Sequence, residues 1–358
     1  MPNPSLLING LDTVQCAYFM AKTGDCLIDF QELAVLREEA RQSKKRDSAA
    51  IQLGRGEFLL APHGTKSGYP FLITNGDLKI EFGEFNKPNF FVTFSSQALW
   101  RESAPLLHQR FLSWAESVGY TQAKPESLSR IDYCFDYHLP EMDFDEDCFK
   151  SRSTKDAQYR ENGKAQTFSF GRGDIVLRVY DKVAEIEQQS EKSWFYVLWG
   201  RDSEVWRIEW QVRRPVLERF DIKTFKDFTE NYGDLLRYLA EDHDTLRQRS
   251  GDSNSSRWPL HPLWVDLQER IRELPHMGIL KVYGEQAALK DRENRIAQSV
   301  YGYLKRLAAI KCVQRGKESM SAEDALRELF NGVKRHHDPL TWKFDVEKRI
   351  TEIRLGQW

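Results

Sequence analysis

Short runs of alternating apolar and polar residues dominate the chain from Leu6 to about Phe94. Glycine and proline separate the runs, a pattern that predicts antiparallel strands joined by hairpins. Between them, the segment from Phe30 to Lys45 has apolar residues at helical spacing and ends in basic residues. These basic residues either form a solvated helix end or contact a phosphate. The runs are LLINGLDTVQCAYF, EFLLA, YPFLIT, LKIEFGEF and NFFVTF.

The middle of the chain mixes helices and strands. Apolar positions from Gln97 to Val118 recur every three or four residues, which predicts a helix packed on the sheet. Strands are predicted at Ser129–Tyr137, at Gln166–Lys182 as a hairpin, and at Val205–Arg213, followed by a helix from Phe225 to Leu246.

The segment RQRSGDSNSSRWP has no periodicity and is rich in serine, glycine and arginine, which is typical of a linker. We therefore predict a first domain at 1–247, a linker at 248–262 and a helical domain at 263–358. Helices in the last are expected near 263–274, 285–314, 321–335 and 341–355. The predicted class is α+β, with a central antiparallel sheet, packed helices and a mainly helical C-terminal region.

Composition limits the function classes. The 358 residues carry 52 Lys and Arg against 54 Asp and Glu, a net charge of −2, so a nucleic-acid surface would have to be a local patch. The first residues, MPNPSLLING, lack the pattern of a secretory signal, and no apolar stretch is long enough to span a membrane, so a cytoplasmic location is expected. The five cysteines form no C-x-x-C pair, which argues against a zinc knuckle.

Three predicted strands place charged residues on one face. Side chains alternate along a strand, so in SRIDYCFDY the acidic residues share a face that excludes the aromatic ones. The same parity applies to IVLRVYDK and VWRIEWQVRR. If these strands are neighbours, a single face carries Arg130, Asp132, Asp136, Arg178, Tyr180, Lys182, Arg207, Glu209 and Arg213.

Such a face permits two interpretations. Clustered carboxylates are unfavourable unless cations neutralise them, and oxygen ligands of this type suit Mg²⁺ or Mn²⁺, which catalyse phosphoryl transfer. A tyrosine beside them would be the nucleophile, because Arg178 and Lys182 can help to form its phenolate. The alternative is a solvated face of salt-bridged pairs, which is common in antiparallel sheets.

The three segments resemble the signature of the replication initiator and relaxase family that includes the Rep proteins of staphylococcal rolling-circle plasmids and relaxases of integrative and conjugative elements. RIDYCFD matches the family's strand R-h-D-h-h-h-D. FGRGDIVLRVYDK matches its strand pair F-G-x-R-x-S-x-x-x-R-I-Y-x-K, and WRIEWQVR matches W-R-h-E-h-x-h-+. Together with a looser lead-in, the resemblance covers about residues 6–240.

This resemblance implies a nickase-like palm in which Tyr180 becomes joined to the 5′ phosphate of a nicked DNA strand. It implies that Asp132 and Glu209, and more weakly Asp136, hold the Mg²⁺ or Mn²⁺ ion. Phosphate or transition-state contacts are implied for Arg178, Lys182 and Arg207, and DNA contacts are expected at Arg130, Arg172 and Arg213. The expected partner is DNA, as a single-stranded or hairpin origin with flanking duplex; a host helicase and a homodimer are further partners to test, and no membrane is expected.

The chain departs from the family in its short GRGD turn, and it lacks the His-hydrophobic-His pair of related nickases. Two other functions stay open: an origin-binding or regulatory protein that does not cut, and a metal-dependent nuclease that uses water.

Other aromatic and basic residues have competing readings. Tyr133 and Tyr137 face the core by parity, and Tyr159 and Tyr196 are expected in loops. A segment containing Trp194, Phe195, Trp199 and Arg201 would either stack bases or pack ordinarily. Basic residues of the helical tail would either bind duplex DNA or lie on a solvated bundle: Lys281, Lys290, Arg292, Arg295, Lys305, Arg306, Lys311, Arg315 and Lys317.

Overall fold

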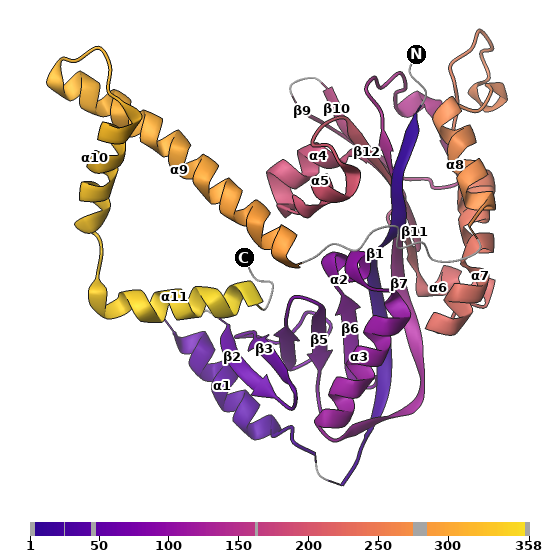
Figure 1. Ribbon diagram of the computed structural model, residues 1–358. Coiled ribbons are helices and arrows are strands. Elements are labelled where there is room, and N and C mark those ends of the chain that lie inside the picture. The colour runs from indigo at the N-terminus through magenta and orange to yellow at the C-terminus, as the bar shows by residue number, and fades with distance from the viewer. Residues whose placement is uncertain (1–3, 25, 44–47, 162–163, 275–284, 355–358) are drawn as a thin grey trace. The chain divides into compact units, whose positions relative to one another are not determined.

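The computed structural model describes residues 4–24, 26–43, 48–161, 164–274 and 285–354. It confirms the predicted α+β class. Its centre is an antiparallel sheet of eleven strands in the order β2-β3-β4-β5-β6-β1-β7-β12-β11-β10-β9 (Figure 1). Within the described residues, no helix combines the length and the apolar character that crossing a bilayer requires.

Two long strands form the middle of this sheet. β1 (Ser5–Lys22) and β7 (Tyr120–His138) pair antiparallel along most of their length. Beyond β1 lie β6 (Phe90–Phe94), β5 (Leu78–Phe82), β4 (Phe71–Thr74), β3 (Gly56–Leu60) and β2 (Ala49–Leu53). Beyond β7 lie β12 (Val205–Arg213), β11 (Ile175–Asp181), β10 (Lys164–Phe170) and β9 (Asp156–Glu161).

The helix predicted from Gln97 to Val118 is two helices, α2 (Ser96–Arg101) and α3 (Ala104–Ser117). Ser103 separates them because its side chain accepts a hydrogen bond from the Leu106 amide and so begins a new helix. Pro105, in the first turn of α3, has no amide hydrogen to continue the preceding helix. The earlier helix, α1 (Phe30–Gln42), agrees with the prediction.

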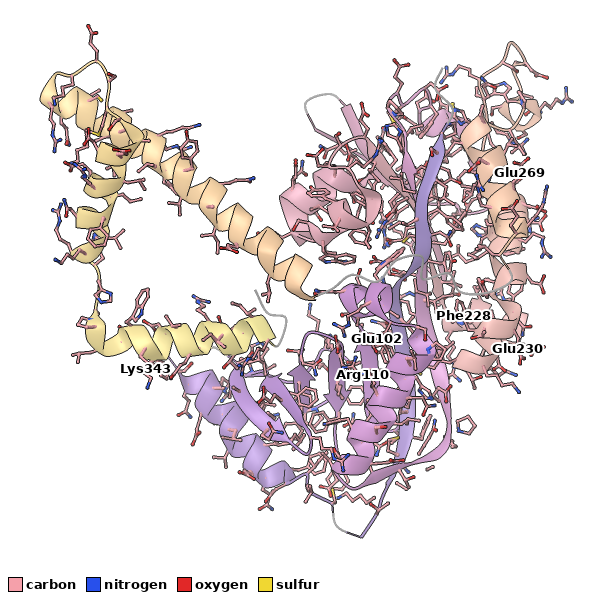
Figure 2. The ribbon with its side chains drawn as sticks, viewed as in Figure 1. Glu102, Arg110, Phe228, Glu230, Glu269 and Lys343 are labelled. Atoms are coloured by element: carbon pink, nitrogen blue, oxygen red, sulfur yellow. The ribbon has the colours of Figure 1, made fainter. Side chains whose placement is uncertain are left out.

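The hydrophobic core lies on one face of the sheet. α7 (Phe225–Tyr238) and α8 (Pro262–Arg272) stand beside that face (Figure 1). Phe228 of α7 is buried and stacks on Tyr232, whereas Glu230 and Glu269 lie exposed on the outer side of the two helices (Figure 2). This asymmetry is the amphipathic pattern expected of helices that cover a sheet.

The helix predicted from Phe225 to Leu246 ends early. After Tyr238 the chain forms a π-turn, η4 (Leu239–His243), and then β13 (Asp244–Leu246), which pairs with β8 (Phe149–Ser151). Leu246 is fully buried there, so tertiary packing rather than helical periodicity explains its apolar character. Short helical turns η1 (Glu146–Cys148) and η5 (Ser255–Arg257) flank this region.

The predicted domain boundaries, with a linker at 248–262, stay a prediction. Trp264 of α8 donates a hydrogen bond to the Ala240 carbonyl and packs on Trp210, so α8 belongs to the sheet unit. Of the described residues, those up to 274 fall in a first compact unit and those from 285 to 354 in a second. The second contains α9 (Glu285–Arg315), α10 (Ala322–Lys334) and α11 (Pro339–Arg354). These confirm the three helices predicted for this region.

In the second unit, Lys311 and Arg315 of α9 both pair with Glu328 of α10. Lys305 and Arg306 are exposed and lie over the rings of Tyr301 and Tyr303. Lys281 lies outside the described residues, as do the side chains of Lys290, Arg292 and Arg295. Binding of duplex DNA by this unit stays a prediction.

Candidate active site

The three charged strands are neighbours, which is the condition under which their charged residues share one face. β12 pairs with β7 on one side and with β11 on the other. The register places Arg207 directly opposite both Asp136 and Tyr180, and it places Glu209 opposite Arg178. Because directly opposite residues share a face, the charged side chains gather on the face opposite the core.

The side chain of Tyr180 is hydrogen-bonded to a carboxylate. Its hydroxyl donates to Glu209 Oε2 at 3.0 Å, and the other oxygen of Glu209 accepts from Arg178 at 3.1 Å. Burial raises the pKa of Tyr180 well above its ordinary value, and the negative charge of Glu209 raises it further. The phenol is therefore protonated at rest, with a proton acceptor already in hydrogen-bonding distance.

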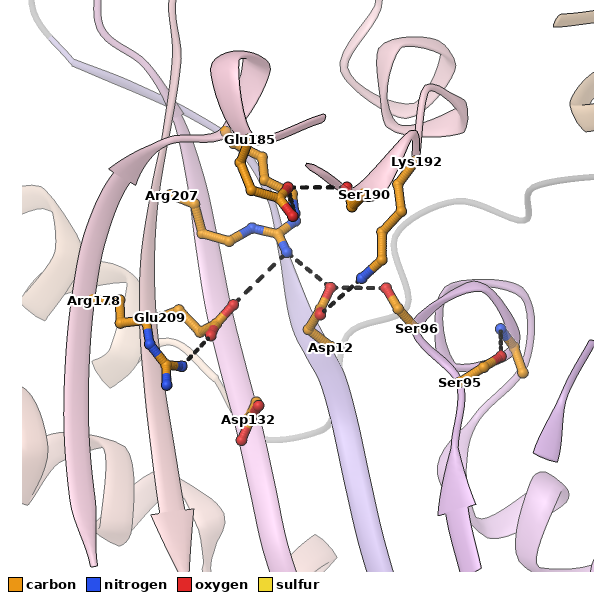
Figure 3. Close-up of polar contacts among 12 residues, drawn as sticks. Asp12, Ser95, Ser96, Asp132, Arg178, Glu185, Ser190, Lys192, Arg207 and Glu209 are labelled. Atoms are coloured by element: carbon orange, nitrogen blue, oxygen red, sulfur yellow. Dashed lines mark hydrogen bonds and ion pairs between the residues drawn. The ribbon is translucent and has the colours of Figure 1, made fainter. Parts of the chain in front are cut away.

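Arg207 is the centre of a buried ion cluster (Figure 3). Its Nε and one terminal nitrogen donate to the two oxygens of Asp136 at 2.6 and 2.8 Å, and the other terminal nitrogen donates to Asp12 at 2.8 Å. Trp199 Nε1 also donates to Asp136, at 2.9 Å. Both oxygens of Asp136 are thus occupied by fully buried donors, which favours a structural role for this carboxylate over the predicted metal ligation.

Asp12 is a site residue that the sequence prediction missed. It accepts hydrogen bonds from Ser96 at 2.8 Å and Lys192 at 3.4 Å as well as from Arg207 (Figure 3). Burial alone would raise the pKa of Asp12, but Lys192 and Arg207 outweigh it and lower the pKa well below its ordinary value. A lone carboxylate inside the apolar run LLINGLDTVQCAYF was the signal that could have identified it.

A β-bulge in β1 explains how Asp12 reaches the site. The pairing of β1 with β7 shifts by one residue between Leu11 and Thr13, so Asp12 has no partner of its own. The extra residue lets Asp12 face the charged side while Val14 and Cys16, at the same parity, are buried in the core.

Asp132 lies on the same face but outside the Arg207 cluster. Arg130 binds it with two nitrogens. Burial raises the pKa of Asp132 to about 6; Arg130 opposes this shift, and the negative charges of Glu209 and Asp12 add to it. Burial is thus the main cause of the raised pKa of Asp132, and the neighbouring carboxylates add to it.

Lys182 begins α4 (Lys182–Glu185) rather than ending a strand. It is buried, pairs with Glu185 at 2.5 Å, and lies 5.6 Å from the ring centroid of Tyr180. Burial lowers the pKa of Lys182, and the neighbouring Arg207 lowers it further. Lys182 is therefore near the predicted nucleophile, as expected from the sequence.

The aromatic segment after α4 is packed rather than open. Through the π-turn η2 (Ile186–Ser190) the chain reaches α5 (Trp194–Trp199), whose Phe195 is buried with its ring 4.4 Å from the Arg207 guanidinium. The prediction that Tyr196 lies in a loop is wrong, because it is part of α5, and Tyr159 lies in β9. Ordinary packing accounts for these aromatic residues.

Three arginines expected to contact DNA are spread along one end of these strands. Arg130 and Arg213 lie opposite each other in β7 and β12, and Arg172 is exposed in the turn between β10 and β11. Among the residues described, no group of three His, Cys, Asp or Glu side chains is arranged to hold a metal ion. The carboxylates instead pair with arginines: Asp132 with Arg130, Glu209 with Arg178, and Asp136 with Arg207.

Comparison with known proteins gives one named likeness. No protein-family model and no curated protein matches the chain. Among solved structures, the chain is similar to a rolling circle replication initiator protein from Geobacillus stearothermophilus, at 20% identity over 77% of this chain and 100% of that one, with a TM-score of 0.46.

Proposed function

We propose that this protein nicks one DNA strand and rejoins it through a 5′-phosphotyrosine at Tyr180, as the motif resemblance implies. The observation that supports this most directly is the 3.0 Å hydrogen bond from Tyr180 to Glu209. A nucleophile in hydrogen-bonding distance of its base, with the base oriented by a third group, is the arrangement that covalent catalysis requires. Arg178 is that third group.

The chemical step balances with residues of this chain. The Tyr180 oxygen attacks the phosphorus, its proton passes to Glu209, and the bond from phosphorus to the 3′ oxygen breaks. The departing oxygen takes up a proton from solvent, and Glu209 gives its proton back to solvent. The resulting 3′ hydroxyl either primes replication or later attacks the phosphotyrosine to restore the strand. Because the bond energy is kept in the phosphotyrosine, no nucleotide hydrolysis is needed.

Two arginines have different parts in this proposal. The Arg178 side chain is 34% exposed, so it can turn from Glu209 to a phosphate oxygen as negative charge develops there. Arg207 is 0% exposed, is held by Asp12 and Asp136 and pairs more distantly with Glu209 at 4.0 Å, so it acts by positioning these carboxylates and not by touching the phosphate.

Metal dependence is a separate part of the proposal. Asp132 and Glu209 would hold a Mg²⁺ or Mn²⁺ ion, because their partners Arg130 and Arg178 are partly exposed and can release them. Asp136 fits poorly, since its partner is fully buried. A bound ion would polarise the phosphate and stabilise its negative charge.

The role that this chemistry supports is initiation of rolling-circle replication or mobilisation of a plasmid, phage or integrative element. Its substrate would be a single-stranded or hairpin origin. A host helicase and a second copy of the chain are proposed partners, and a cytoplasmic location fits this role.

The test is formation of a covalent protein–DNA adduct. Full-length protein is incubated with labelled oligonucleotides tiled across the DNA beside its gene, with Mn²⁺ or EDTA, and resolved on a denaturing gel. Wild type is expected to give a slow-migrating adduct that Tyr180→Phe lacks. Tyr133→Phe is the matched control, because Tyr133 is also buried and donates a hydrogen bond, but on the core face.

The outcomes separate the rival functions. Cleavage that persists in Tyr180→Phe without an adduct would establish a nuclease that uses water. Binding without cleavage of any oligonucleotide would establish an origin-binding or regulatory protein.

A further inference from the structure

A basic cleft lies at the far end of β11 from Tyr180. Its volume is about 510 Å³, and its walls come from the loop after β8, the β10–β11 turn, and the helical segments α6 (Arg214–Leu217), η3 (Glu218–Phe220) and the end of α7. Its ionisable residues, apart from Tyr238, are Arg152, Lys155, Arg172, Asp174, Arg219 and His243.

The cleft is held in shape by backbone hydrogen bonds. The Gly171 amide donates to the Lys155 carbonyl at 2.7 Å, and the Arg152 amide donates to the His243 carbonyl at 2.9 Å. Gly171 has a φ of +94°, and a Cβ there would lie 2.3 Å from the Ile175 carbonyl oxygen, so this turn requires glycine. The two loops are therefore fixed relative to each other before any ligand binds.

The charge of the cleft is unbalanced. Arg152, Lys155, Arg172 and Arg219 are exposed, and none of the four has an ion-pair partner in the part of the chain that the structure describes. Asp174 is the single carboxylate of the lining. This contrasts with the charged face around Tyr180, where Arg130, Arg178 and Arg207 each have a carboxylate partner, and it marks the cleft as a site for an anion.

The cleft adjoins the end of β12, one of the strands that carry the proposed active site. The Arg213 amide donates to the Asp174 carbonyl at 2.8 Å, so the turn meets the end of β12 directly. Arg213 and Arg130 lie opposite each other on the charged face, at this end of β12 and β7. Tyr180 is five residue steps along β11 from Ile175, a distance of roughly 17 Å. A DNA backbone can cover that distance in a few nucleotides.

From this geometry we infer that the cleft binds phosphates of the same DNA strand that Tyr180 attacks, a few nucleotides from the scissile bond. This rests on the proposed function for the identity of the ligand. A phosphate there is recognised through charge and not through the bases, since the lining offers guanidinium and ammonium groups to backbone oxygens. The cleft would therefore anchor the strand without setting the sequence that is cut.

The experiment measures DNA binding separately from cleavage. Full-length protein carrying Tyr180→Phe is titrated with a fluorescent thymidine oligonucleotide of about 20 nucleotides, long enough to reach both sites, over a range of salt concentrations. The variant Arg152→Gln/Arg172→Gln removes two cations of the cleft. The control Arg41→Gln/Arg110→Gln removes two exposed, ion-paired arginines from α1 and α3 (Figure 2 labels Arg110).

Loss of two phosphate contacts is expected to weaken binding about tenfold and to make the slope of log K against log salt less negative by about 1.4, with little change in the control. An unchanged slope in the cleft variant would overturn the inference. Inorganic pyrophosphate that binds the cleft without competing with the oligonucleotide would also overturn it, by assigning the cleft to a free anion.

The adduct assay keeps the two proposals apart. The double cleft variant with Tyr180 intact is expected to form the adduct at saturating DNA but to need about tenfold more DNA. Adduct formation by wild type together with unchanged binding by the cleft variant would leave the proposed function standing and the cleft inference refuted.

Discussion

Replacing Arg207 with methionine tests the buried ion cluster most directly. The side chain has no exposure and donates to Asp136 twice and to Asp12 once. Arg207→Met keeps an apolar stem of similar shape but removes every donor. Asp12 retains Ser96 and Lys192, whereas Asp136 retains only the Trp199 indole among the contacts described.

The cost follows from leaving Asp136 buried without a cation. Breaking a buried ion pair by removing one partner destabilises a protein by about 3–5 kcal/mol. For a unit of this size, 1 kcal/mol lowers the melting temperature by roughly 2–4 °C, so the expected decrease is about 6–20 °C. Since the whole free energy of unfolding is about 5–15 kcal/mol, the variant is expected to be marginally stable.

Thermal unfolding of the full chain, followed by circular dichroism near neutral pH, measures this decrease. Arg41→Met is the control, because Arg41 is 62% exposed and pairs with Glu38 on the same helix; it is expected to change the free energy by less than about 0.5 kcal/mol. The double variant Arg207→Met/Asp136→Leu is expected to recover part of the loss, since it removes the orphaned charge. A melting temperature for Arg207→Met within about 2 °C of wild type would refute the reasoning.

Three further predictions concern the carboxylates. The pKa of Asp132 is raised to about 6 from 3.8, so the folded state favours the protonated form and loses stability as pH rises from about 4 to about 6. Asp132→Asn should therefore be more stable than wild type near pH 8 by up to about 3 kcal/mol, with no gain near pH 4. Equal gains at both pH values in thermal unfolding would contradict this. The pKa of Asp12 is lowered, so its carboxylate stabilises the folded state above about pH 4, and this stabilisation is lost as pH falls through the folded-state pKa. Asp12→Asn should be less stable than wild type near pH 7. A difference in stability that stays constant down to about pH 2 would disprove the assignment. Glu209→Gln should slow adduct formation about 10²–10⁴-fold in single-turnover assays. Glu204 is an exposed carboxylate just before the same strand, and the control Glu204→Gln should not slow it. Equal rates for the two variants would show that Glu209 is not the base.

The sequence predicted those parts of the fold that depend on local periodicity. Parity along β7, β11 and β12 identified the charged face, because these strands are regular and their pairing preserves the alternation. It could not show that Asp136 faces a fully buried arginine, since burial depends on α5 packing above the sheet through Phe195. For the same reason the sequence could not decide whether the aromatic residues of α5 stack bases or pack ordinarily.

Interruptions of periodicity explain the remaining differences. The helix predicted from Gln97 to Val118 is broken by a capping serine, and the one from Phe225 ends in a π-turn whose apolar residues continue the helical pattern. The loops that form the basic cleft contain no motif, because its four cations come from three separate segments of the chain. Their proximity is a property of the tertiary structure alone.

The bulge in β1 has a consequence for insertions and deletions. Because Asp12 is the extra residue of that strand, deleting one residue between Leu11 and Thr13 would restore a continuous ladder with β7 and need not unfold the sheet. It would, however, remove the acceptor that Arg207 and Lys192 share. Among relatives of this chain, a one-residue gap at this point of an alignment would therefore distinguish proteins that keep the palm from those that also keep its ion cluster.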